Sequence, residues 1–459
     1  MSAKATIAAI ATPPGQGGVG IVRMSGPASA AILEEMVGRG PERFEPHRLH
    51  LCEICDLEGR VIDESLAVHM PGPKSYTGED VVEFQCHGGP IILRRVLDAC
   101  LAAGARIADP GEFTQRAFLN GRLDLTQAEA VADLVNATTE SAHEMALEHL
   151  RGDLGEAVEE MVEWLTEAIV LVEAAIDFSN EEHVYQIEAQ EVGLRITKAQ
   201  ERLIRLREQF DRGRRRREGV KAVILGPTNA GKSTLFNGLH GTERAIVTDV
   251  AGTTRDFLEE ELHLGGTAIR LIDTAGLRET GDQVESIGIE RSREMGRAAD
   301  LLMWVVDQSR PMAPEERQEL EALAGDGRPC LVVLNKQDQP CGLSTEDQAL
   351  VERFEHRFPT ELDGPRRRGL DEVLDALEEI GARLTAGEGV LLSRARHLEK
   401  VVEALEALER AQQGLEIGME HELIAIDLRD GLDALGAITG RVDTEDILGR
   451  IFSEFCVGK

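Results

Sequence analysis

One loop, Gly226–Ser233, constrains the fold of this 459-residue chain more than any other feature. Its sequence, GPTNAGKS, fits the pattern GxxxxGKS, and it lies between the apolar run Val220–Leu225 and a helical segment. Glycines allow backbone N–H groups to close around phosphate oxygens, and the start of a helix adds positive potential. We therefore expect Lys232 to reach the β- and γ-phosphates of a nucleotide and Ser233 to bind Mg²⁺.

Two later motifs stand directly after apolar runs, in the order that a guanine-nucleotide site requires. Asp273–Gly276 (DTAG) supplies an aspartate for the Mg²⁺ shell, and the N–H of Gly276 can meet the γ-phosphate. Asn335–Asp338 (NKQD) ends in a carboxylate that can accept hydrogen bonds from guanine N1–H and its 2-amino group, which adenine cannot supply. The combination predicts a GTP-binding site rather than a site for ATP.

A switch loop and a water-positioning group are expected between these motifs and just after them. Gly252–Asp256 (GTTRD) offers Thr254 as a second Mg²⁺ ligand. Leu277 stands where Ras-like enzymes carry the glutamine that orients water, so another group must do so. The candidates are the acids of the following stretch, Glu279, Asp282, Glu285 and Glu290. The alternative is that this stretch is only a solvated acidic loop.

The distribution of apolar residues predicts several domains. Continuous apolar runs in 218–385 suit parallel strands buried on both faces, which indicates a doubly wound α/β domain. Residues 122–217 and 386–459 have helical periodicity, so we expect the α/β domain to be an insertion into a helical domain. Residues 1–121 mix turns with short β-like runs and predict an α+β domain; examples of the runs are Thr6–Ala11, Gly20–Met24, Ser65–Met70 and Val81–Gln85. The arginine-rich stretch Asp211–Gly219 is expected to be a solvated linker, with phosphate contact as the alternative.

Charge and cysteine content narrow the class of protein. The formal net charge is −33, which predicts a solvated acidic surface, although a local basic patch can still bind RNA. Seven scattered cysteines do not form a disulfide framework, and Cys52 and Cys55 are a lone CxxC without the second pair that a zinc site requires. The absence of a long apolar run or an export signal leads us to expect a cytoplasmic protein without a membrane span.

Motifs spread over the whole chain resemble those of the MnmE (TrmE) family of tRNA-modification GTPases. The final segment, ending Cys-x-Gly-Lys, is the most specific of them. The matching segments are Ala11–Arg23, Ser75–Asp80, His87–Pro90, Pro110–Phe113, Arg116–Asn120, Ile246–Asp249, Gly252–Asp256, Asp273–Glu279 and Leu448–Lys459. This resemblance implies a Ras-like GTPase domain and an N-terminal domain that binds a reduced folate.

For the nucleotide site, the resemblance implies a set of GTP, Mg²⁺ and K⁺ contacts. Ser233 and Thr254 would hold Mg²⁺, while Lys232 and Glu285 would act in catalysis, Glu285 by positioning water. K⁺ would take the place of an arginine finger as the GTPase domains dimerise, held at Asn229, Thr248, Val250 and Thr253. The GTP contacts would be Asn229, Ala230, Gly231, Lys232, Ser233, Thr234, Thr248, Asp249, Val250, Ala251, Gly252, Thr253, Thr254, Asp273, Thr274, Ala275, Gly276, Asn335, Lys336 and Asp338.

For the rest of the chain, the resemblance implies a modification pathway. The family forms homodimers through its N-terminal domains and works with an FAD protein, MnmG, as a heterotetramer. Together they place an aminomethyl or carboxymethylaminomethyl group on C5 of the wobble uridine, U34, of certain tRNAs. A 5,10-methylene- or 5-formyl-tetrahydrofolate would bind at Arg23, Glu83, Arg122 and Lys459, of which Arg122 stands where many members have lysine. Cys456 is either a nucleophile or radical partner, or a structural thiol.

A rival interpretation is a GTPase that binds RNA without modifying it. A regulatory or ribosome-assembly GTPase that binds RNA without modifying it would lack both the folate-type domain and the Cys-x-Gly-Lys tail, so we favour the modification enzyme.

The guanine-binding loop, usually Ser-Ala-Arg, reads Asp363-Gly364-Pro365 here. Because Gly364 keeps its backbone N–H, we expect recognition of guanine O6 to persist.

Overall fold

The computed structural model describes residues 5–177, 182–242, 258–273, 295–362, 367–387 and 389–441, with 448, 451, 452, 455, 456 and 458 of the C-terminal tail. The chain forms two compact units. One contains residues 1–135, 146–202 and 400–459, and the other contains 136–145 and 203–399. The multidomain fold is confirmed, while the boundaries expected at 121, 217 and 385 stay predictions.

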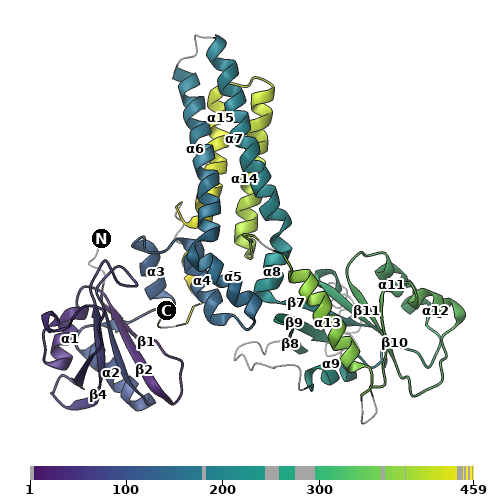
Figure 1. Ribbon diagram of the computed structural model, residues 1–459, viewed down its shortest axis with the longest axis horizontal. Helices are drawn as coiled ribbons and strands as arrows, with labels where there is room; N and C mark the ends of the chain where they lie inside the picture. The colour runs from purple at the N-terminus through teal and green to yellow at the C-terminus, as the bar shows by residue number, and fades with distance from the viewer. Residues whose placement is uncertain are drawn as a thin grey trace, which may run out of the picture. The chain divides into compact units, whose positions relative to one another are not determined.

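The first unit begins with a six-stranded sheet in the order β3-β4-β5-β2-β1-β6. Three of its strands, β1, β2 and β4, are labelled in the purple part of Figure 1. All its strand pairs are antiparallel except β1 with β6. The strands are β1 (Ile7–Ile10), β2 (Gly17–Ser25), β3 (His50–Cys55), β4 (Val61–Met70), β5 (Val81–Gly88) and β6 (Arg106–Ile107). Helices α1 (Ser29–Val37) and α2 (Pro90–Ala102) bury one face of this sheet, and a 3-10 turn, η1, spans Pro41–Arg43.

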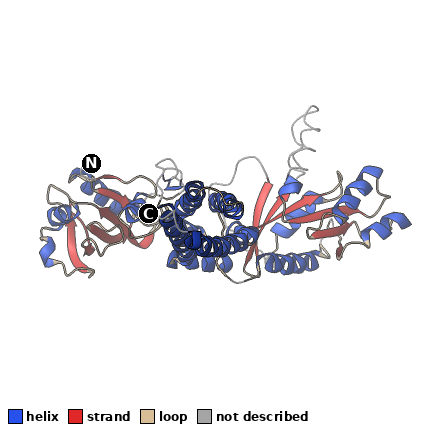
Figure 2. Cartoon of the chain, turned by 90° about the horizontal axis from the view of Figure 1, so that it is seen from above, coloured by secondary structure: helices blue, strands red, loops and turns tan. Residues whose placement is uncertain are grey.

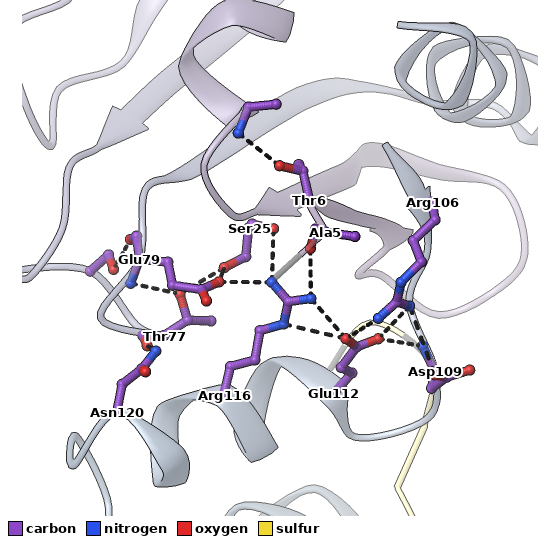
Figure 3. Close-up of polar contacts among 12 residues, drawn as sticks. Ala5, Thr6, Ser25, Thr77, Glu79, Arg106, Asp109, Glu112, Arg116 and Asn120 are labelled. Atoms are coloured by element: carbon purple, nitrogen blue, oxygen red, sulfur yellow. Dashed lines mark hydrogen bonds and ion pairs between the residues drawn. The ribbon is translucent and has the colours of Figure 1, made fainter. Parts of the chain in front are cut away.

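A buried ion network fixes helix α3 (Glu112–Leu119) against the start of the chain (Figure 3). The Arg116 guanidinium, 4% exposed, donates to Glu79 Oε2 at 2.8 Å and to Glu112 Oε1 at 2.9 Å. It also donates to the Ala5 carbonyl oxygen at 2.8 Å, and Arg106 forms a second pair with Glu112 at 2.5 Å. Because each buried charge has a partner, the network avoids the cost of an isolated ion in the interior.

Four long helices follow and lie side by side in both views (Figures 1 and 2). They are α6 (Asp153–Asp177), α7 (Glu182–Glu208), α14 (Ala395–Glu416) and α15 (His421–Thr439), preceded by α4 (Leu125–Asn136) and α5 (Glu140–Arg151). Gly431 of α15 allows close packing, because a Cβ there would lie 3.2 Å from a methyl carbon of Leu408 and 3.7 Å from one of Leu165. The bundle is therefore built from segments on both sides of the second unit in the sequence.

The described part of the C-terminal tail packs back on the first unit. Phe452 and Phe455 are buried in a cluster with Leu125 and Ala128 of α4. Gly111 donates its N–H to the Cys456 carbonyl oxygen at 3.4 Å, and a Cβ on Gly111 would lie 2.8 Å from the Phe452 carbonyl oxygen. Glycine at this position thus allows the tail to approach the start of α3.

The second unit contains a six-stranded sheet in the order β12-β11-β10-β7-β9-β8, parallel except for β8. Helices α9 and α13 cover one face, and α11 and α12 cover the other, so the doubly wound α/β fold is confirmed. The strands are β7 (Val220–Leu225), β8 (Leu258–Leu264), β9 (Thr267–Asp273), β10 (Leu301–Asp307), β11 (Cys330–Asn335) and β12 (His356–Pro359). The helices are α9 (Lys232–His240), α11 (Pro314–Ala324), α12 (Thr345–Val351) and α13 (Leu370–Thr385).

The prediction of a solvated linker at residues 211–219 is wrong, because Phe210–Glu218 forms helix α8. Arg214 and Arg215 donate to the same oxygen of buried Asp300, at 2.6 and 2.9 Å. Burial raises the pKa of Asp300, but the two guanidinium groups and the Lys221 N–H lower that pKa by more, so the carboxylate stays ionised. Arg214 and Arg215 are therefore paired inside the unit instead of being solvated.

The two ends of the inserted segment are in contact. A Cβ on Gly213 of α8 would collide with the carbonyl oxygen of Leu392, just before α14. Gly213 is itself buried. Helix α8 and the segment before α14 are thus in contact, although the whole α/β sheet lies between them in the sequence. Among the described residues, no helix has the length and apolar character needed to cross a bilayer.

The charge network around α3 should make the stability of the folded protein depend on pH. Burial raises the pKa of Glu112, but its bonds from Arg106, the Asp109 N–H and Arg116 lower that pKa by more, to a net value below the ordinary 4.5. Its contribution to stability is therefore complete above about pH 4.5 and disappears as the pH falls through the folded-state pKa. Glu112→Gln should destabilise the protein by about 3 kcal/mol at pH 7 and by much less in acid.

Urea unfolding at a series of pH values measures this difference. Glu58→Gln is the matched control, because Glu58 pairs with Arg60 on the surface, where both side chains are about 70% exposed. A Glu112→Gln variant as stable as wild type at pH 7 would show that the network contributes nothing.

Candidate functional site

The P-loop lies where the sequence predicts it, between the end of β7 and the start of α9. Gly226 has φ 134° and a Cβ there would lie 2.5 Å from the Val305 carbonyl oxygen, so only glycine fits. Asn229 and Gly231 also have positive φ, 64° and 105°. Positive-φ residues that alternate with a residue of ordinary φ, here Ala230, turn backbone N–H groups towards one concavity, which suits an anion.

Lys232 lies against the loop that precedes it. Its Nζ donates to the carbonyl oxygens of Gly226 at 3.0 Å and Pro227 at 2.7 Å, and the residue is 6% exposed. The first residue of α9 therefore places a positive charge on the inner side of the loop. This is the location at which phosphate oxygens of a nucleotide would need a cation.

Oxygen ligands suited to Mg²⁺ come together where β9 ends and α9 begins. Asp273, the last residue of β9, pairs in register with Ile224 of β7 and is 1% exposed. Its Oδ2 accepts a hydrogen bond from Ser233 Oγ at 2.8 Å. A hydroxyl and a carboxylate are the hard oxygen donors that Mg²⁺ prefers, so these residues fit the ion that the sequence predicts.

The NKQD motif is joined directly to the P-loop. Asn335 ends β11, and its Nδ2 donates to the Ala230 carbonyl oxygen at 2.8 Å. Lys336 follows with φ 68°, and Asp338 is exposed at the surface. The parts expected to bind phosphate and base are therefore held together by a side chain that is itself 1% exposed.

Several predicted residues lie outside the described residues. Within the nucleotide site, the structure describes Asn229, Ala230, Gly231, Lys232, Ser233, Thr234, Asp273, Asn335, Lys336 and Asp338. The positions outside are Thr248, Asp249, Val250, Ala251, Gly252, Thr253, Thr254, Thr274, Ala275, Gly276, Glu285, Asp363, Gly364, Pro365 and Lys459. Their assignments stay predictions.

The N-terminal domain brings two of the residues expected to bind folate together. Arg23 of β2 donates from Nε to Glu83 of β5 at 2.7 Å and from Nη1 to the Gly458 carbonyl oxygen at 3.4 Å. Its Cζ lies 5.8 and 5.7 Å from the ring centroids of Tyr76 and Phe113, within cation–π range. Both rings fall inside motifs of the sequence resemblance, yet reasoning from sequence gave them no role.

The other two candidates in this unit lie at its surface. Arg122 is exposed just after α3, where a Cβ on Gly78 would lie 3.4 Å from its Cγ. Cys456 is an exposed thiol, while its carbonyl oxygen contacts Gly111. In contrast, burial raises the pKa of the Cys52 thiol, which faces the sheet core, and among the described residues no group of three or more His, Cys, Asp or Glu could hold a metal.

Comparison with known proteins places the whole chain in one family. Residues 6–122 match the family model for the GTP-binding protein TrmE N-terminus, and residues 125–456 match the model for the MnmE helical domain. The tRNA modification GTPase MnmE of Geobacter sulfurreducens is 43% identical over 99% of both chains. The proteins of the same name from Pseudomonas paraeruginosa and Aquifex aeolicus are 44% and 42% identical, over 100% and 99% of both chains. The chain belongs to the MnmE family.

The two family models of MnmE together match almost the full length of the chain. The two matched regions meet between α3 and α4, at residues 122 and 125. A solved G domain, that of the T. maritima FeoB iron transporter, is 25% identical and covers 35% of this chain and 97% of its own. Its TM-score is 0.24, so the family assignment rests on the sequence matches.

Proposed function

We propose that this chain is the GTP-hydrolysing member of a tRNA-modifying complex that acts at the wobble uridine. The observation that carries the proposal is 43% identity over 99% of both chains to a tRNA modification GTPase. The P-loop, Asp273 and Asn335 meet at one sheet edge, as GTP binding requires. The match of residues 6–122 to the TrmE N-terminus favours modification over a purely regulatory or ribosome-assembly GTPase.

For hydrolysis, we propose roles for the residues at this edge. Lys232 binds and orients the β- and γ-phosphates, and Ser233 with Thr254 holds Mg²⁺, which neutralises phosphate charge when bound. Asp338 selects guanine, and Glu285 orients the attacking water. Asn229, Thr248, Val250 and Thr253 hold K⁺; the position of Asn229, an exposed residue of the P-loop, supports this role.

For modification, we propose that the Arg23 region binds a reduced folate as the one-carbon donor. A folate carries carboxylates and a flat ring, and Arg23 offers a guanidinium beside Glu83 and two aromatic rings. Arg122 and Lys459 complete the cationic set. Cys456, exposed on the same tail, is a candidate nucleophile. A homodimer, a MnmG-type FAD partner forming a heterotetramer, and a cytoplasmic location complete the proposal.

The main test is nucleoside analysis of tRNA from cells lacking this chain. The aminomethyl and carboxymethylaminomethyl groups at C5 of the wobble uridine should disappear. They should return with the wild-type gene but not with Lys232→Ala. Unchanged wobble uridines, together with accumulated ribosomal precursors on a sucrose gradient, would favour the ribosome-assembly alternative.

Hydrolysis should depend on K⁺ and on Glu285. At matched ionic strength, turnover in K⁺ should exceed that in Na⁺, because the smaller ion fits a K⁺-sized set of oxygens poorly. Glu285→Ala should lower kcat by roughly a hundredfold while GTP affinity is retained, since orienting water adds little to ground-state binding. Steady-state phosphate release with a GTP-binding titration measures both. Equal turnover in the two salts would contradict the K⁺ site.

The C-terminal tail should contribute to folate binding and not to the nucleotide site. Deleting residues 455–459 removes Lys459 and the Gly458 carbonyl contact to Arg23, so the affinity for 5-formyl-tetrahydrofolate should fall by tenfold or more. GTP hydrolysis by the isolated protein should be unchanged. Isothermal titration calorimetry measures the affinity, and an equal dissociation constant for the truncated chain would refute the assignment.

A further inference from the structure

The guanine-selecting loop Asn335–Asp338 rests on two residues that belong to none of the recognised motifs. Asp307 is the last residue of β10, and it aligns with Asn335 of the parallel neighbour β11. Gln308 follows directly. The pair therefore lies beside the loop along its first three residues, and both are at least nine-tenths buried, with exposed fractions of 9% and 6%.

Asp307 binds the side chain of the loop's lysine. Lys336 Nζ donates to Asp307 Oδ2 at 2.6 Å, and Asp307 Oδ1 accepts from the N–H and the hydroxyl of Ser309 at 3.0 and 2.6 Å. Burial raises the pKa of Asp307, but Lys336 and Ser309 lower that pKa by more, so the carboxylate is ionised at neutral pH. Charge-assisted bonds of this kind are stronger than neutral ones.

Gln308 holds the backbone and the next side chain of the same loop. Its N–H donates to the Asn335 carbonyl oxygen at 3.2 Å, and its Nε2 donates to the Lys336 carbonyl oxygen at 3.3 Å. Its Oε1 accepts from Gln337 Nε2 at 2.7 Å. One buried glutamine thus contacts three consecutive residues, the last of which directly precedes Asp338.

These contacts matter because the loop adopts a conformation that its sequence does not favour. Lys336 has φ 68°, in the left-handed region that residues with a side chain rarely occupy. Asp307 holds its side chain, Gln308 holds its carbonyl, and Gln339 donates to that same carbonyl at 3.0 Å to close the turn. The direction in which exposed Asp338 points follows from this turn.

We propose that Asp307 and Gln308 are positioning residues that determine the preference for guanine over adenine. The inference rests on the proposed GTP-binding function and deepens it. Neither side chain needs to touch the nucleotide. They act by keeping Asp338 where its carboxylate can accept from guanine N1–H and the 2-amino group, an interaction that an adenine nucleotide does not make. Loss of either residue therefore weakens binding of GTP selectively.

Competition binding of GTP, GDP and ATP to the full-length protein tests the proposal with Gln308→Ala and Asp307→Asn. GTP and GDP affinities should each fall by roughly tenfold, while the weak ATP affinity changes little, so the discrimination ratio falls. Turnover at saturating GTP should stay within about twofold, because the loop contributes equally to binding the ground and transition states. Asp307→Glu, which keeps the carboxylate, should recover part of the ratio.

Asp347→Asn is the matched control for loss of a buried aspartate pair in the same unit. Asp347 is fully buried and bound by Arg317 at 2.8 Å, outside the nucleotide motifs. It should lower the melting temperature and leave the GTP-to-ATP ratio unchanged. If Gln308→Ala and Asp307→Asn do the same, their role is merely structural and the inference is overturned. Wild-type protein that binds ATP as tightly as GTP would instead overturn the proposed function and the inference together.

Discussion

The parallel pairing of β7 with β9 on one side and β10 on the other is the constraint on which the nucleotide site depends. Because the strand order reverses at β7, the connections after β7 and β10 lead to helices on opposite faces of the sheet and leave a crevice for a ligand at the carboxyl ends of these strands. Ser233 meets Asp273 across one side, and Asn335 meets Ala230 across the other. Single hydrogen bonds between the P-loop segment and the ends of β9 and β11 thus bring three distant sequence motifs into one site.

Sequence reasoning succeeded where burial on both faces leaves a continuous apolar run. The apolar run Val220–Leu225 coincides with β7, because a strand with almost no polar residue is recognisable from its sequence alone. It missed β8 and β3, whose alternating or acidic residues suit partly exposed edge strands equally well as loops. It also failed at α8, because local composition predicts a solvated arginine run. The neutralising Asp300 lies 85 positions away from Arg215, and no local pattern reveals it.

For the candidate site, sequence motifs located the residues expected to touch a ligand but not those that hold them. Arg116, Glu112 and Glu79 come from three segments of the family resemblance and form one buried charge network, so their role here is to fix α3. Tyr76 and Phe113 instead flank Arg23. Asp307 carried one signal that could have been used: like Asp273 and Asn335, it is a polar residue at the carboxyl end of a buried strand.

The contact between Gly213 and Leu392 has a consequence for how such a chain can be assembled. A segment whose two ends touch closes a loop, and once that segment is folded the surrounding chain loses almost no further conformational entropy by accommodating it. The entropy cost of joining the helices on either side of the α/β domain is therefore similar to that of a short surface turn. This explains how a GTPase of independent fold can occupy the middle of a helical domain without interrupting its core. The junction therefore needs no side chain at Gly213, where the segments that enter and leave the inserted domain approach each other most closely.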